Sequence, residues 1–148
     1  MSKDIYRALL SEFSQRIGLA GRFDDIDEPC SLVFKDVALT LFLDEAGGGL
    51  VNVFVDFGDF PRERALAIFE RLLEINLLVC AQGSPRLGLD AETGRVIFTY
   101  AYPVQGLTAQ KLLGSLDMAV QQAAVWRQGF YLDAPRVNAP ELRDALMV

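Results

Sequence analysis

The sequence predicts an α+β fold: a helix, a three-stranded antiparallel meander, a second helix, a β-hairpin and a third helix, in a compact single domain that forms a homodimer. Two observations predict it. Apolar residues recur with the helical period over residues 3–17, 61–78 and 109–128. Between these segments, residues 30–57 and 87–102 alternate with the period of two that is typical of half-buried strands.

Length and composition allow one domain with a sizeable core, because the chain has 148 residues and 51% of them are hydrophobic. The net charge is −6, and the chain has no long basic run, which argues against a nucleic-acid partner. Histidine is absent, which removes Ser-His-Asp and Cys-His catalysis and histidine metal sites. We therefore expect no enzymatic activity.

Targeting signals also bear on the location of the protein. The N-terminus has an amphipathic pattern in place of a signal peptide, and no apolar run is long enough to span a membrane. Cys30 and Cys80 form no CxxC pair, and we expect two reduced, buried thiols. These features predict a cytoplasmic protein.

The first helix is expected over residues 3–17 and ends at Gly18. Its apolar stripe consists of Ile5, Leu9, Phe13 and Ile17. Tyr6 and Leu10 widen this stripe. We therefore expect the helix to pack on the core and also to offer Tyr6 and Leu10 to a partner.

An acidic connector over residues 19–29 follows, with Asp24, Asp25, Asp27 and Glu28. A calcium or magnesium site is one interpretation, but the spacing lacks the glycine and distal glutamate of an EF-hand loop. We favour a solvated loop and expect no metal and no cofactor.

Three strands are expected at residues 30–34, 37–43 and 50–57. One face is apolar and should lie on the core: Leu32, Phe34, Leu39, Leu41, Val51, Val53 and Val55. The second face should be polar, but it carries a group of apolar residues: Val33, Phe42, Leu50 and Phe54. Such a group marks either a binding patch or a surface covered by a second helix or a dimer partner. The glycines at 47–49 are typical of a flexible hairpin tip.

The second helix, residues 61–78, begins at Pro61 and has an apolar arc of about 180°, wider than the stripe of about 100° that packing on one sheet requires. The excess favours self-association over deep burial in a monomer. We expect four residues at the dimer contact: Leu66, Phe69, Leu73 and Asn76.

The hairpin over residues 87–102 turns at Asp90–Gly94, and its aromatic ladder is typical of packing. The last helix, residues 109–128, is capped by Thr108 and carries Trp126 as a core anchor. We place the domain at residues 1–131. Residues 132–148 form a C-terminal tail, which is partly disordered or holds a short helix.

Several short segments of the sequence, in this order of elements, resemble those of a known family. The strongest part of the resemblance is Leu72–Leu77, followed by Gly83–Asp90 and Glu92–Val96. Leu9–Leu19 and Ala124–Arg127 also match. Over roughly residues 5–128, the chain resembles the class I type III secretion chaperones, the Tir-chaperone-like family. None of these pieces is a catalytic signature.

The resemblance implies a homodimer that binds the N-terminal region of a secreted effector and keeps it secretion-competent without nucleotide hydrolysis. In the family, the second helix contributes to dimerisation, and the effector uses hydrophobic grooves and adds a strand to the sheet edge. We assign effector binding to Tyr6, Leu10, Val33, Phe42, Leu50 and Phe54. Two alternatives remain: a small-molecule-binding or enzymatic domain, and a regulatory module with a non-secreted partner.

Overall fold

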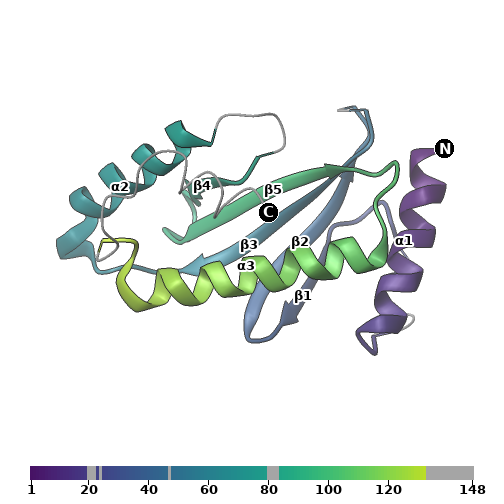
Figure 1. The fold of residues 1–148 in the computed structure, drawn as a ribbon, viewed down its shortest axis with the longest axis horizontal. Helices are drawn as coiled ribbons and strands as arrows, with labels where there is room; N and C mark the ends of the chain where they lie inside the picture. Colours follow the sequence, from purple (N-terminus) through teal and green to yellow (C-terminus); the bar gives the residue numbers. More distant parts are fainter. Residues whose placement is uncertain (20–22, 24, 47, 80–83, 133–148) are drawn as a thin grey trace.

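The computed structural model describes residues 1–19, 23, 25–46, 48–79 and 84–132. Its elements follow in the order α1 (Ser2–Arg16), β1 (Cys30–Phe34), β2 (Val37–Asp44), β3 (Leu50–Gly58), the 3-10 helix η1 (Arg62–Arg64), α2 (Ala65–Leu78), β4 (Arg86–Leu89), β5 (Val96–Pro103) and α3 (Ala109–Gly129) (Figure 1). The predicted α+β fold and its order of elements are confirmed. One boundary differs: Pro61 precedes η1, and α2 begins only at Ala65.

The strands form one five-stranded sheet in the order β1-β2-β3-β5-β4, and all neighbours are antiparallel. The β4–β5 hairpin therefore extends the meander, with β5 paired to β3. The turn between β1 and β2 is tight, because Lys35 and Asp36 both have positive φ, at 49° and 66°. A pair of positive φ values is typical of a two-residue type I′ turn, whose twist suits a hairpin.

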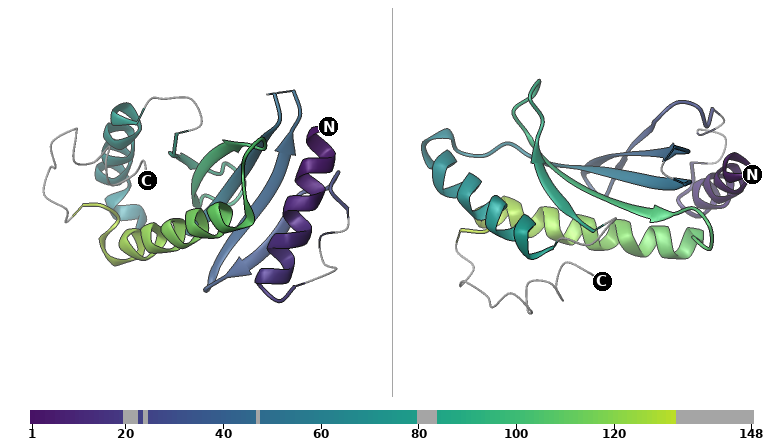
Figure 2. Two further views of the ribbon diagram at one scale, coloured as in Figure 1. Left: turned by 45° about the vertical axis from the view of Figure 1, so that its right-hand side comes forward. Right: turned by 90° about the horizontal axis from the view of Figure 1, so that it is seen from above.

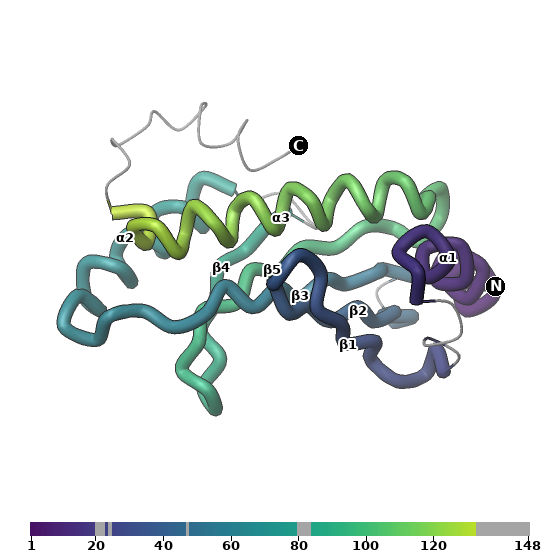
Figure 3. The backbone as a smooth tube through the Cα atoms, turned by 90° about the horizontal axis from the view of Figure 1, so that it is seen from below, coloured from purple at the N-terminus to yellow at the C-terminus, as the bar shows by residue number. Residues whose placement is uncertain are grey.

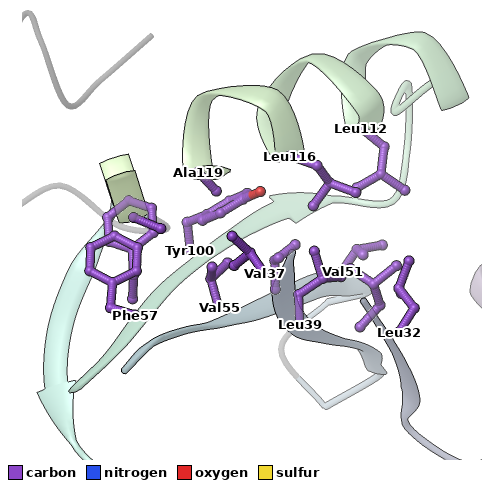
Figure 4. Close-up of a cluster of buried hydrophobic side chains, with 14 of the residues drawn as sticks. Leu32, Val37, Leu39, Val51, Val55, Phe57, Tyr100, Leu112, Leu116 and Ala119 are labelled. Atoms are coloured by element: carbon purple, nitrogen blue, oxygen red, sulfur yellow. The ribbon is translucent and has the colours of Figure 1, made fainter. Parts of the chain in front are cut away.

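Helices α1 and α3 lie on the same side of the sheet, and the β4–β5 hairpin and β1 bend towards the other side (Figures 2 and 3). The core fills the space between the sheet and these helices. In Figure 4, Leu112, Leu116 and Ala119 of α3 face Tyr100 and Val51 of the sheet. All seven residues of the predicted apolar face lie there; six are buried, and Phe34 packs against the core with part of its surface exposed.

The C-terminal end of α3 is fixed by aromatic packing. Trp126 is fully buried, as predicted, and its ring lies 6.3 Å from Phe57 and 5.1 Å from Phe130. After α3, the main-chain oxygen of Tyr131 accepts a hydrogen bond from Arg71 Nε of α2 at 3.2 Å. This contact ties the end of the predicted domain to α2. The predicted tail, except Leu132, lies outside the described residues, as does Cys80.

None of the helices in the described ranges is long and apolar enough to cross a membrane.

Candidate functional site

The face of the sheet opposite α1 and α3 is not covered by any described helix, and it holds an open groove of about 910 Å³. We call it the outer groove. All five strands contribute to its lining, because side chains alternate between the two faces. Its outer-face residues are Ser31, Val33, Ala38, Thr40, Phe54, Asp56, Ile97, Thr99, Arg86 and Gly88.

The predicted apolar group on this face is present and exposed to different degrees. Val33 and Phe54 line the outer groove and are 69% and 42% exposed. Phe42 and Leu50 are partly buried and lie outside the groove lining. Phe42 extends the apolar surface, because its ring packs edge-on against Phe54 with centroids 5.2 Å apart. The alternative that a second helix covers this group does not hold among the described residues.

The prediction that Tyr6 and Leu10 are offered to a partner is wrong. Both are buried, at 0% and 1% exposure, because α1 packs on the inner face of the sheet and the whole widened stripe enters the core. Burial raises the pKa of the Tyr6 hydroxyl, as expected for a group that loses solvation of its charged form. The two residues are therefore core residues on the side of the sheet opposite the outer groove.

Four polar groups in and beside the outer groove are paired within the chain. Ser31 Oγ and Thr40 Oγ1 lie 3.0 Å apart and share a hydrogen bond. Arg95 Nε donates to both carboxylate oxygens of Asp56, at 3.0 and 2.9 Å. Since these groups already have partners, the interactions that the groove offers to a ligand are chiefly apolar contacts.

A second apolar surface lies on α2. Leu66, Leu73 and Leu77 are 69–78% exposed, whereas Ile68, Leu72 and Ile75 are buried against the sheet side of the helix. The spacing of seven and four residues places the three exposed leucines in one stripe. We call it the α2 stripe. Leu77 was not predicted at the dimer contact, although its position four residues after Leu73 indicates the same face.

The other two predicted dimer residues point inward. Phe69 is partly buried, and its ring packs edge-on against Phe60 at 5.2 Å. The side chain of Asn76 makes two hydrogen bonds with the main chain of Leu87 in β4. These contacts assign Phe69 and Asn76 to packing of α2 within the chain.

An exposed ion pair joins the acidic connector to α1, with Lys3 Nζ 2.8 Å from Asp27 Oδ1. The hydrogen bond from Lys3 lowers the pKa of Asp27. Asp25 Oδ1 accepts the main-chain N–H of Asp27 at 3.1 Å, and Asp24 lies outside the described residues. Within the described ranges, no three His, Cys, Asp or Glu side chains are placed to hold a metal ion together.

Comparisons with known proteins place this architecture among chaperones. The model of the Tir chaperone protein (CesT) family matches residues 8–127. No curated protein matches the chain.

Solved structures with a similar fold include three complexes. A chain of the HopA1–SchA chaperone–effector complex is 22% identical with a TM-score of 0.69, and the alignment covers 87% of this chain and 98% of that one. A chain of the ExsC–ExsE complex is 23% identical with a TM-score of 0.71, and the alignment covers 89% of this chain and 98% of that one. The third structure is the Yersinia pestis type III secretion chaperone SycH in complex with a stable fragment of YscM2. It is 18% identical with a TM-score of 0.65, and the alignment covers 81% of this chain and 98% of that one.

Proposed function

The chain belongs to the Tir chaperone protein (CesT) family and is a type III secretion chaperone, and we propose that it binds the N-terminal region of a secreted effector and keeps that region competent for secretion. The location in this proposal is the cytoplasm, where such a client is held before export. The working unit is the domain of residues 1–131.

The outer groove is the observation that carries this proposal. An exposed apolar groove on a sheet face is uncommon on a monomeric protein and marks a binding surface. Val33 and Phe54 supply apolar contact area, and Phe42 extends it beside the groove. A client that has not folded presents apolar side chains, and the groove can shield these side chains from water.

The similar structures support the same class of partner. SchA is described in a chaperone–effector complex with HopA1, and SycH is described with a stable fragment of YscM2. In each case a protein of this fold is bound to a second protein. By analogy, the ligand of the outer groove is a polypeptide segment.

A homodimer formed through the α2 stripe is part of the proposal. Three leucines that are more than two-thirds exposed on one helix are costly to leave in water, at about 1.5–3 kcal/mol each relative to full burial. Pairing of two α2 helices would bury both stripes. The leucines of the α2 stripe do not line the outer groove, so this pairing does not use the residues assigned to the client.

We propose a non-enzymatic mechanism without nucleotide, metal or cofactor. The chain has no histidine to act as a general base, and the charged side chain of Asp56, which lines the groove, is already paired with Arg95. The chemistry of the groove is therefore binding, by apolar contact and main-chain hydrogen bonds.

Co-purification of the tagged chain from its native cells, with identification of the bound partner, tests the function. The expected partner is the N-terminal segment of a secreted protein in a complex stable to size-exclusion chromatography. Recovery of a bound metabolite, or of a partner that is not exported by the secretion system, would overturn the proposal.

A further inference from the structure

The sheet has two edges, β1 and β4, and they differ in the hydrogen-bonding groups that they leave open. In an antiparallel pair, every second residue of an edge strand directs its N–H and C=O away from its neighbour. At the turn end of β4, Asp90 N donates to Arg95 O at 2.9 Å. By alternation along the strand, Leu87 and Leu89 direct their main-chain groups outward.

The outward groups of Leu87 are taken by one side chain. Asn76 Nδ2 donates to Leu87 O at 2.7 Å, and Leu87 N donates to Asn76 Oδ1 at 2.9 Å. This is the two-bond exchange that a residue of a neighbouring antiparallel strand would make. The carboxamide of Asn76 therefore occupies the place of a sixth strand at this position.

The residue that precedes β4 adds no open N–H to this edge. Pro85 has no N–H to donate, and its carbonyl oxygen accepts a hydrogen bond from Arg86 Nη1 at 3.1 Å. Of the two outward positions within β4, 87 and 89, only Leu89 keeps both main-chain groups for a new strand. One residue is too short a ladder to hold a strand by main-chain pairing.

Within β1 the edge has two open positions, and Pro29 before the strand, like Pro85 before β4, has no N–H to donate. The two-residue turn after β1 pairs Phe34 with Val37, so Ser31 and Val33 direct their main-chain groups outward. No segment of the described ranges pairs with them. The side chain of Val33 is exposed at the same edge.

We propose that Asn76 closes the β4 edge against a further strand, including one from a second copy of this chain, and so directs strand addition to β1. This inference adds the site of strand addition to the proposed function. It rests on the proposed function only for the identity of the strand that β1 receives. Asn76 is thus a positioning residue, since it acts through the main chain of Leu87.

The test replaces Asn76 by leucine, which has a similar volume and makes neither hydrogen bond. Amide hydrogen exchange at Leu87 should become faster by at least about tenfold, because the N–H loses its acceptor. Light scattering should show concentration-dependent growth beyond the wild-type size, because the opened edge pairs with another copy. Asn76→Asp keeps the acceptor for Leu87 N–H and removes the donor to Leu87 O, so we expect partial opening.

A second substitution separates edge opening from general destabilisation. Leu89→Pro removes the remaining outward N–H of β4 and is tolerated sterically on an edge strand. Added to Asn76→Leu, it should return the protein to its wild-type size. Asn52→Asp is the matched control for Asn76→Asp, because Asn52 lies on β3, which is paired on both sides.

Two results would overturn the proposal. One is wild-type exchange at Leu87 together with wild-type size in Asn76→Leu. The other is association of Asn76→Leu that persists after Leu89→Pro is added. Recovery of both variants only as aggregates counts as this second result, because loss of folding would then explain the association. Neither result bears on client binding, so the proposed function would stand.

Discussion

Phe42 and Phe54 are the residues through which the outer groove is best tested. Replacing both by serine removes the aromatic pair without introducing a charge, and neither ring lies in the buried core. Loss of interface aromatics of this kind costs about 2 kcal/mol or more, so we expect binding of the client's N-terminal segment to weaken by about thirtyfold or more. Calorimetric titration measures this change, with circular dichroism to confirm the fold.

Val125→Ser serves as the control for that experiment. Val125 is also an exposed apolar residue, but it lies on α3, away from the groove lining. The affinity of the Val125→Ser protein for the client should equal that of the wild type. If the folded Phe42→Ser/Phe54→Ser protein binds as tightly as the control, the client does not use this surface.

The ion pair between Lys3 and Asp27 predicts a small acid sensitivity. The pKa of Asp27 is lowered in the folded protein, so the pair contributes stability at pH values above the unfolded carboxyl pKa of about 4. That contribution is lost as the pH falls through the lower, folded pKa. Asp27→Asn should therefore reduce the unfolding midpoint slightly at pH 7, and this reduction should become smaller as the pH is lowered towards 2. A reduction of equal size at both pH values would assign the effect to something other than the ion pair.

At the scale of elements, helix α2 has two different sides, and substitutions on them should have different effects. Leu66→Glu and Leu73→Glu place charges in the α2 stripe, where a dimer would have to bury them without partners. We expect a folded monomer at micromolar concentration, measured by light scattering. Ala8→Glu, on the exposed side of α1, is the control and should keep the wild-type mass.

Phe69→Glu should behave differently from these two variants. The ring of Phe69 packs against Phe60 inside the protomer, so a charge there should lower the unfolding midpoint as well as any association. If the wild-type protein is a well-folded monomer at micromolar concentration, the proposed dimer is wrong, whatever the variants do.

At the scale of the whole molecule, the domain boundary is open to a direct test. The main chain is hydrogen-bonded up to Leu132, whose N–H donates to Gly129 O at 3.0 Å, and Tyr131 contacts α2. We therefore expect a chain ending at Leu132 to unfold within about 2 °C of the full chain by calorimetry, because it keeps the hydrogen bonds that hold the end of α3. A larger decrease would show that residues 133–148 belong to the folded unit.

Periodicity was sufficient to predict the elements and the inner face of the sheet. The strands of the meander alternate over most of their length, and a shift of one residue would have exchanged their faces. It was not sufficient for α1, where Tyr6 and Leu10 were expected at the surface. Sequence alone does not tell how much of a helix a curved sheet and a neighbouring helix enclose.

The dimer residues show a second limit. The apolar arc of α2 identified the helix with an exposed stripe, and Leu66 and Leu73 lie in that stripe. Periodicity alone does not show that Asn76 is held by Leu87, because the contact depends on where β4 passes along the helix. Pairing of β5 with β3 was equally outside the reach of local patterns, since it joins segments about 45 residues apart.

The unequal edges of the sheet also set a stoichiometry. In polymer chemistry, a unit with two reactive ends propagates a chain, whereas a unit with one reactive end accepts a single addition and stops. With β4 closed by Asn76 and β1 open, each protomer is monofunctional in this sense. Addition of one strand at β1 is then a terminating step for that protomer, and the assembly with its client has a fixed size. Under this proposal, the two hydrogen bonds of one asparagine limit growth of the assembly through the sheet edges.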